Sequence, residues 1–288
     1  MSNISVEYFG KYRVLNLINT GQSSRLLQAY DDLKQRSVCI KTLSANAAND
    51  SEQVKMLKHE YEVAVKLCHP KLVQVFSFGW QRDVPYIVME WFASPNLKVL
   101  ISRGYGQYCN QIVQLISDMA ESLSYLHLSG WIHRDIKPDN FLFNLNNGEL
   151  KLIDFAIARR YVSSFWRIFA RRSQAQGTRS YISPEQIRGV LPEPSVDIYS
   201  LGCTYYELLA TRLPFSADNM NDLLRKHISA TPPAVMLRNK NVTKEFSDLL
   251  RSMMSKSPID RPKNATELLR IIKSTKIFQR HPKIEDVT

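Results

Sequence analysis

The sequence lacks any long apolar run, and no stretch approaches the roughly 18 residues that a membrane-spanning helix needs. The first ten residues also lack the charged-then-apolar pattern of a secretory signal. Cysteine is scarce: the chain has four, all far apart, with no CxxC pair, which argues against a zinc site and a disulfide framework. These absences favour a reducing compartment, and we expect a cytoplasmic protein without a transmembrane segment.

Acidic residues are outnumbered, 27 against 38 lysines and arginines, which leaves a net charge of +11. Such a balance favours anionic partners, namely nucleotides, acidic proteins, nucleic acid or membrane surfaces, without choosing among them. The hydrophobic share of 44% and the charged share of 23% exclude wholesale disorder, collagen and coiled coil. A chain of 288 residues suits one large domain or two joined lobes.

Short apolar runs bounded by turn residues predict strands in the first third of the chain, with one helix that begins after a capping residue, Asp50. The predicted strands cover residues 12–18, 25–30, 37–42, 72–78 and 86–91.

Beyond Phe92, helical periodicity dominates, and a hairpin with a type I′ turn is predicted around Asn147-Gly148. The predicted helices include residues 112–126, 197–210, 243–255 and 265–273. We therefore expect an α+β fold with a small β-rich N-lobe carrying one helix (10–91), a larger α-helical C-lobe (92–280) and a short tail (281–288).

The residues that carry chemistry flank the predicted hairpin. The run HRDIKPDN occupies 133–140, and Asp154-Phe155-Ala156 follows the hairpin. In phosphoryl transfer a carboxylate orients the attacking hydroxyl, two oxygen ligands hold Mg²⁺, and a cation neutralises the γ-phosphate. Asp135 suits the first role, Asn140 and Asp154 suit the second, and Lys137 suits the third.

With these motifs the sequence resembles the eukaryotic-type protein kinase family over nearly its whole length. The residues at 183–186 and 197–203 are most similar to those of bacterial members. The resemblance implies a bilobal protein-kinase-like fold, ATP with Mg²⁺ or Mn²⁺ as cofactors, and a protein substrate phosphorylated on serine or threonine. Lys137 together with Thr178 is the serine/threonine-kinase pattern, and the Thr178 hydroxyl should bridge Asp135 and Lys137.

By the same resemblance, Lys41 is the phosphate-anchoring lysine and Glu60 is the carboxylate that holds it. Glu62 is the rival, but it should lie on another face of the helix. Glu185 should pair with Arg261, and Asp197 should accept hydrogen bonds from the catalytic-loop backbone.

The resemblance also implies an adenine site, whose residues could equally be plain core residues. Its members are Ile18, Leu26, Cys39 and Leu142 as walls, Met89 as gatekeeper, and the Glu90 carbonyl and Phe92 amide as hinge hydrogen-bond partners.

Two places depart from the family pattern. The glycine-rich loop keeps only Gly21, because Asn19 and Ser24 replace the other glycines, and we expect a stiffer loop with weaker nucleotide affinity. Asn19 tolerates positive φ and could preserve some backbone freedom. Ala156 replaces the glycine of the DFG motif, and an alanine at φ > 0 costs roughly 1–2 kcal/mol.

The predicted activation segment, 154–185, is rich in arginine and aromatic residues. We expect residues 159–179 either to dock a partner, an acidic substrate or an anionic membrane, or to pack their aromatic side chains on the C-lobe. Loop phosphorylation is a further hypothesis, with candidates Ser163, Ser164 and Ser173.

Three functions fit these residues to different degrees. An active serine/threonine protein kinase uses all of them, while the depleted glycine loop and Ala156 keep a pseudokinase-like nucleotide-binding scaffold as the alternative. A small-molecule or lipid kinase is opposed by the intact protein-docking segment at 177–185, and no base-stacking motif favours specific nucleic-acid binding.

Overall fold

The computed structural model describes residues 7–161 and 177–287, and the described chain divides into two compact units. Unit 1 consists of Met1–Ala93 together with Asp154–Ala156, and unit 2 consists of Ser94–Ile153 and Ile157–Thr288. The short stretch Asp154–Ala156 therefore belongs to the unit that lies earlier in the sequence. A mixed α+β composition, with a β-rich first unit and a helical second unit, agrees with the expected fold class.

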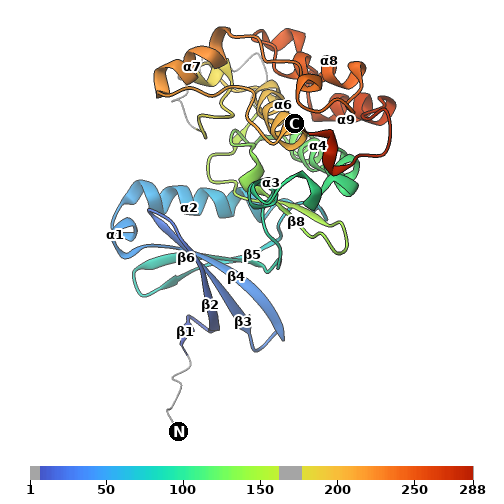
Figure 1. The fold of residues 1–288 in the computed structure, drawn as a ribbon. Helices are drawn as coiled ribbons and strands as arrows, with labels where there is room; N and C mark the ends of the chain where they lie inside the picture. Colours follow the sequence, from blue (N-terminus) through green and yellow to red (C-terminus); the bar gives the residue numbers. More distant parts are fainter. Residues whose placement is uncertain (1–6, 162–176, 288) are drawn as a thin grey trace. The chain divides into compact units, whose positions relative to one another are not determined.

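The described part of unit 1 holds a six-stranded sheet in which every pair of neighbours is antiparallel (Figure 1). In spatial order the strands are β1 (Tyr8–Phe9), β2 (Tyr12–Thr20), β3 (Ser24–Asp31), β4 (Arg36–Leu43), β6 (Val84–Glu90) and β5 (Val75–Gln81). Residues on β3 and β4 alternate between buried and partly exposed, so one face of the sheet forms the core. Leu27, Ala29, Val38 and Ile40 are the buried residues of these two strands in that core.

Two helices of unit 1 follow β4, the short α1 (Ala45–Ala48) and the longer α2 (Ser51–Ala64), which lies along the sheet in Figure 1. Asp50 is the N-cap of α2, and its side chain accepts a hydrogen bond from the Glu52 amide at 2.9 Å. The buried residues of α2 fall on one face and include Glu60. A carboxylate on an otherwise apolar face requires a partner inside unit 1.

Unit 2 is built mainly from helices around α6, which is buried at every position from Ser195 to Ala210 (Figure 1). Its helices are α3 (Leu97–Ser102), α4 (Ile112–Leu128), α5 (Pro184–Ile187), α6 (Pro194–Ala210), α7 (Met220–Ser229), α8 (Lys244–Met253) and α9 (Ala265–Ser274). Short 3₁₀ turns connect them: η1 (Tyr105–Gln107), η2 (Cys109–Gln111), η3 (Pro138–Asn140), η5 (Val235–Leu237), η6 (Pro258–Asp260) and η7 (Ile284–Asp286). The predicted long helices are all confirmed, whereas the sequence reasoning missed α3, α5 and α7.

Two small antiparallel pairs complete unit 2: β8 (Phe141–Phe143) with β9 (Leu150–Leu152), and β7 (Trp131–Ile132) with β10 (Arg159–Arg160). The predicted hairpin is confirmed, but its type I′ turn is wrong. Gly148 has φ of 74°, whereas Asn147 is not among the described residues with positive φ, and a type I′ turn requires both. Instead, the side chains of Asn144 and Asn147 accept hydrogen bonds from the amides of Asn146 and Glu149, which stabilises a longer loop.

The last described residues pack onto unit 2. Asp286 of η7 accepts hydrogen bonds from Arg280 at 2.5 Å and from the Asn241 side chain at 2.9 Å. Ile284 approaches Gly106 so closely that a Cβ there would lie 2.9 Å from its side-chain carbons. The stretch 281–287 therefore has specific contacts with the body of unit 2.

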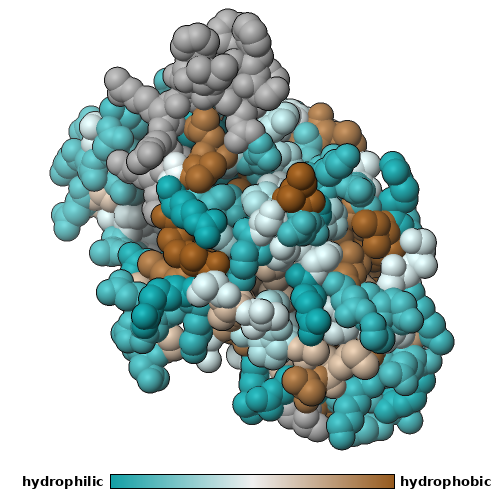
Figure 2. All heavy atoms as spheres, turned by 90° about the horizontal axis from the view of Figure 1, so that it is seen from above, coloured by the Kyte–Doolittle hydropathy of each residue, from teal (hydrophilic) through white to brown (hydrophobic). Residues whose placement is uncertain are grey.

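In the view of Figure 2 the described surface is mainly hydrophilic, and its hydrophobic patches are small and separated. Within residues 7–161 and 177–287, helices long and apolar enough to cross a membrane are absent.

Candidate active site

In unit 1, three charged side chains from distant positions meet. The Lys41 ammonium on β4 donates to both carboxylate oxygens of Glu60, at 2.9 and 2.7 Å, and to Asp154 Oδ1 at 3.2 Å. The predicted pairing of Lys41 with Glu60 is confirmed. The rival Glu62 has a side chain that is 54% exposed and lies 4.0 Å from Lys58, so it occupies another face of α2, as expected.

The electrostatics of this cluster keep the lysine charged. Burial by itself lowers the pKa of Lys41, but the carboxylates of Asp154 and Glu60 outweigh burial and raise its pKa above the usual value. Burial raises the pKa of Glu60, against the opposing effect of the Lys41 charge. The result is a permanent cation held in a fixed position by two carboxylates, an arrangement suited to binding an anionic group.

The left-handed residue in the Asp154-Phe155-Ala156 motif is the aspartate. Asp154 has φ of 67°, in a region that aspartate adopts more readily than most other non-glycine residues. Ala156 is not among the described residues with positive φ. The expected strain at Ala156 is therefore wrong in this structure, because the left-handed turn falls two residues earlier.

The loop that should cover a nucleotide is a plain strand connection. The Gly21 amide donates to the Ser24 carbonyl at 2.8 Å, and Asn19 lies in β2 opposite Leu26 of β3. Neither Gly21 nor Asn19 is among the described residues with positive φ, so the tolerance of Asn19 for that conformation is not used. A Cβ on Gly21 would meet its nearest atom at 3.5 Å, an ordinary van der Waals contact.

Several predicted adenine residues share one face of the unit 1 sheet. Leu26 lies opposite Lys41, and Cys39, two residues from Lys41 on β4, lies opposite Met89 on β6. Because directly paired residues point to the same side of an antiparallel sheet, these four side chains lie on one face. Burial raises the pKa of the Cys39 thiol to about 11, so it stays protonated. The remaining predicted members are Ile18 on β2, Glu90 at the end of β6, Phe92 just after it, and Leu142 on β8 of unit 2.

In unit 2, the donors that hold the carboxylate of Asp135 include Lys137 and Thr178. Lys137 Nζ donates to Oδ2 at 2.7 Å, and the Thr178 amide donates to Oδ1 at 2.8 Å. Lys137 also donates to the Thr178 hydroxyl at 2.6 Å. Thr178 thus contacts both residues, but the expected hydroxyl bridge is wrong in one respect: the backbone amide, not the hydroxyl, reaches Asp135.

Asn140 joins the same loop through its amide nitrogen. Nδ2 donates to the Asp135 carbonyl at 2.8 Å and to its carboxylate at 3.3 Å. The nitrogen is therefore used inside the loop, and the side-chain oxygen is the atom left to act as a ligand.

A buried carboxylate on α6 holds the backbone of this loop. Asp197 is fully buried, and it accepts hydrogen bonds from the amides of His133 and Arg134 at 2.8 and 2.7 Å. His127 Nε2 lies 3.0 Å from the same carboxylate. The prediction for Asp197 is confirmed.

Unit 2 also fixes the segment that carries Thr178. Gly177 has φ of 116°, and a Cβ there would lie 3.0 Å from the Arg134 carbonyl, so this close approach requires glycine. At the end of the segment, Glu185 accepts hydrogen bonds from the buried Arg261 guanidinium at 2.6 and 3.0 Å. The predicted pairing of Glu185 with Arg261 is confirmed.

Part of the predicted activation segment lies outside the described residues. This holds for the phosphorylation candidates Ser163, Ser164 and Ser173 and for the aromatic residues at 165, 166 and 169. Arg159 and Arg160 are described and form β10. The docking hypothesis for 159–179 therefore stays a prediction.

One network was missed by the sequence reasoning. Glu207 on α6 accepts hydrogen bonds from Lys98 on α3 and from the Tyr181 hydroxyl, both at 2.5 Å. The available signal was a single acidic residue in the apolar run that ends α6, because a buried carboxylate needs partners.

Comparison with known proteins identifies the family. Residues 12–271 match the protein kinase domain. The chain is 30% identical over 265 residues to serine/threonine-protein kinase PrkC of Bacillus subtilis, covering 92% of this chain and 40% of that protein. It is 29% identical to serine/threonine-protein kinase PknB of Mycobacterium leprae and 31% identical to a probable serine/threonine-protein kinase of Streptomyces coelicolor, covering 90% of this chain and 42% and 39% of those proteins.

The chain thus spans about two fifths of the length of these curated relatives. The matched region contains both charged clusters, that of unit 1 and that of unit 2. On these grounds the chain belongs to the protein kinase family.

Proposed function

We propose that this chain is an ATP-dependent serine/threonine protein kinase, which transfers the γ-phosphoryl group of ATP to a serine or threonine hydroxyl of a protein. The observation that carries the proposal is the fixed position of the Asp135 carboxylate. Lys137 donates to its Oδ2, and the Thr178 amide donates to its Oδ1. A carboxylate held in this way has the geometry of a group that orients a hydroxyl and takes its proton.

In the proposed reaction the substrate hydroxyl oxygen forms a bond to the γ-phosphorus, and the bond from that phosphorus to the bridging oxygen of ADP breaks. Asp135 accepts the hydroxyl proton, and Lys137, 2.7 Å away, offsets negative charge on the transferring group. Lys41 anchors the phosphates, and Glu60 holds Lys41 in position.

We further propose that Asn140 and Asp154 would hold Mg²⁺ or Mn²⁺. The side-chain oxygen of Asn140 and the carboxylate of Asp154 are hard oxygen donors, which fit these ions. Within residues 7–161 and 177–287 a cluster of three or more His, Cys, Asp or Glu ligands is absent, which agrees with Mg²⁺ because it is commonly held by one or two carboxylates plus substrate phosphates. When bound, the ion supplies charge neutralisation at the phosphates.

The proposal assigns adenine binding to the remaining predicted residues. Support comes from the shared sheet face of Leu26, Cys39 and Met89, to which Lys41 also belongs. Ile18, Gly21, Glu90, Phe92 and Leu142 complete the proposed nucleotide site.

The cell compartment and the partners form part of the same proposal. All four cysteines are free thiols, which supports a reducing cytoplasm. The substrate is a protein, and the arginine-rich segment 159–179 is a further docking site, supported by its charge.

The test is the substitution Asp135→Asn, with Asp139→Asn as a matched control that makes the same chemical change four residues away. We expect Asp135→Asn to reduce phosphate transfer by about 10²- to 10⁴-fold, the usual worth of acid–base catalysis. Transfer from radiolabelled ATP to a generic basic protein measures the effect, and thermal shift with Mg-ATP checks nucleotide binding. Undiminished transfer by Asp135→Asn would contradict the role of this residue.

The same assay separates the alternative function. A pseudokinase-like scaffold predicts a thermal shift with Mg-ATP in the wild type but no transfer to itself or to the basic protein. The complete set of Lys41, Glu60, Asp135, Asn140 and Asp154 supports the active enzyme.

A further inference from the structure

Two pockets of unit 2 share a common wall. One, of about 550 Å³, is lined in part by Lys98, Glu207 and Thr211. The other, of about 630 Å³, is also lined by Glu207 and Thr211 and by two arginines, Arg212 and Arg238. Because they share residues, we treat the two pockets as one surface, the α6 groove.

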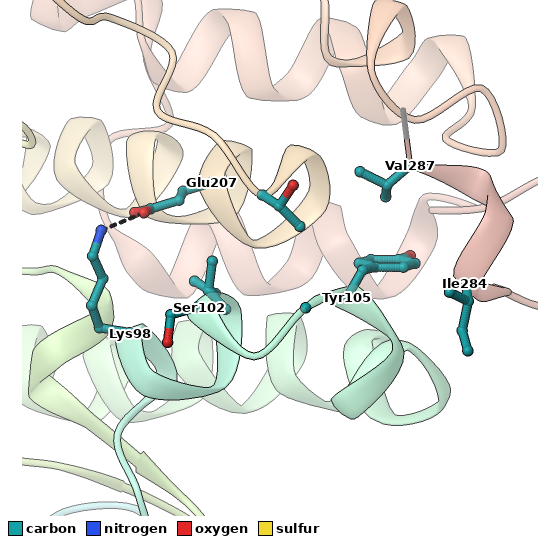
Figure 3. A pocket seen from close by; sticks show the side chains of 9 residues that line it. Lys98, Ser102, Tyr105, Glu207, Ile284 and Val287 are labelled. Carbon is teal, nitrogen blue, oxygen red and sulfur yellow. Dashed lines mark hydrogen bonds and ion pairs between the residues drawn. The ribbon is translucent and has the colours of Figure 1, made fainter.

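One end of the first pocket is polar and the other is apolar. Figure 3 shows Lys98 from α3 bound to Glu207 from α6 at one end, and Tyr105, Ile284 and Val287 at the other. The first pocket is therefore assembled from α3, α6, the turn after α3 and the packed tail, whereas the second pocket adds the loop after α6 and the residues around η5.

The charge of the groove is basic. The cationic lining residues are Lys98, Arg212 and Arg238, and Glu207 is the acidic residue among the described lining residues. The Glu207 side chain is only 5% exposed, and its two oxygens accept from Lys98 and Tyr181. Its charge is thus already satisfied, and it is a poor site for a basic ligand, whereas Arg212 is exposed to solvent.

The backbone beneath the groove is strained. Thr211 follows α6 with φ of 53°, and a β-branched residue in the left-handed region is a genuine outlier. The next residue is Arg212, so this conformation sets the direction in which the chain presents the arginine. Strain of this kind concentrates at functional positions.

Contacts within unit 2 connect the groove to the proposed catalytic carboxylate. The Thr178 amide donates to Asp135, the Tyr181 amide donates to the Thr178 carbonyl at 3.0 Å, and the Tyr181 hydroxyl donates to Glu207. The three residues from Thr178 to Tyr181 span at most about 11 Å. With the length of the Tyr181 side chain added, Glu207 at the near end of the groove lies within about 20 Å of Asp135. An extended peptide covers that distance in about six residues.

We propose that the α6 groove docks an acidic segment of the protein substrate, with Arg212 and Arg238 as the residues that bind its anionic side chains. The proposal rests on the proposed function and names the substrate class. Charge complementarity carries it: among the described lining residues Glu207 is the one carboxylate and it is already paired, so the basic groove favours an anionic peptide.

The experiment measures peptide binding to the full chain by fluorescence anisotropy. Two peptides share one serine, with a cluster of identical residues about six positions before it and another about six positions after it. The clusters are glutamate in one peptide and glutamine, which is isosteric but neutral, in the other. A third peptide carries phosphoserine in the cluster, so that carboxylate and phosphate sources of the anion are distinguished. The protein variants are Arg212→Glu with Arg238→Glu, and the control Arg270→Glu, an exposed arginine on α9.

We expect the wild type to bind an anionic peptide at least about tenfold more tightly than the glutamine peptide, since two attractive pairs contribute. The double charge reversal should remove this preference and Arg270→Glu should retain it, and added salt should weaken it. If the double reversal does not fold, Arg212→Gln with Arg238→Gln makes the same test without new negative charge.

Two outcomes would overturn the proposal. One is equal binding of all three peptides by the wild type. The other is an anionic preference that persists in the double variant, which would move docking elsewhere, for instance to the arginines at 159–179. Binding is also measured in Asp135→Asn, so that a failure of the proposed catalysis and a failure of the groove give different results.

Discussion

The two charged clusters of this chain are held in different ways. In unit 1, the Lys41 ammonium is positioned by ion pairs with the carboxylates of Glu60 and Asp154. In unit 2, the catalytic-loop backbone is positioned by the buried carboxylate of Asp197, whose partners include two backbone amides. The first arrangement depends on side-chain ionisation, whereas the second is part of the fold. A substitution at Glu60 should therefore change activity more than stability, and a substitution at Asp197 should do the reverse.

The strongest test of this contrast is Asp197→Ala. It leaves two buried amides without their acceptor, and we expect the free energy of unfolding to fall by about 3–5 kcal/mol. Urea denaturation measures the change. Asp248→Ala is the control, because Asp248 is 53% exposed in its ion pair with Lys244, and such pairs contribute less than about 1 kcal/mol. Equal losses in the two variants would mean that the Asp197 contacts do not hold the loop.

The stability of unit 2 should also depend on pH, because this unit buries a neutral histidine. His227 on α7 lies against Tyr199, whose hydroxyl is 3.0 Å from Nδ1, and against the Phe215 ring. Burial, and then the nearby charge of Lys256, lower the pKa of His227 to about 4. The unfolded chain takes up this proton below about pH 6.5, and the folded chain takes it up only near pH 4.

The stability that this difference contributes is therefore complete above pH 6.5 and is lost as the pH falls toward 4. The full loss is about 3 kcal/mol, from 1.36 kcal/mol for each pKa unit. Denaturation at pH 7.5 and 4.5 should show a smaller decrease in His227→Phe than in the wild type. A decrease in His227→Phe as large as that of the wild type would refute the assignment.

The smallest expected effect on stability lies in unit 1. Glu60→Gln removes one of the two carboxylates that hold Lys41, and Asp154 remains, so we expect a loss of only about 1–2 kcal/mol. Transfer should fall by about 10²-fold, because a displaced lysine no longer positions the phosphates. Glu62→Gln on the same helix should change neither quantity. A large stability loss with normal transfer in Glu60→Gln would reverse the comparison between the two units.

Local sequence signals predicted the long helices and most of the strands, whereas the contacts within the site were predicted from the family resemblance. The pairing of Lys41 with Glu60 was expected from the resemblance to the protein kinase family, and the structure confirms it. The contacts of Asp197 and the pairing of Glu185 with Arg261 were expected from the same resemblance and are also confirmed. A buried charge needs a partner, which is the physical reason for these pairs, but the partners themselves were identified through the family pattern.

Other features depend on geometry that no short stretch of sequence encodes. Lys98 and Glu207 lie 109 positions apart, and only packing brings α3 beside α6. The loop at Asn147-Gly148 adopts a longer turn because two asparagine side chains bond to its backbone. The left-handed residue near β9 is Asp154 and not Ala156, which agrees with the greater tolerance of aspartate for this conformation.

The left-handed backbone of Asp154 has a consequence for the whole unit 1 cluster. This conformation is uncommon for residues other than glycine, and the surrounding contacts, among them the bond from Lys41, help to maintain it. Lys41 thus stabilises the position of Asp154 in addition to its proposed role at the phosphates, and its removal would let the aspartate adopt another backbone conformation. Loss of this one cation would then impair two parts of the site at once, the phosphate anchor and the carboxylate proposed to bind metal.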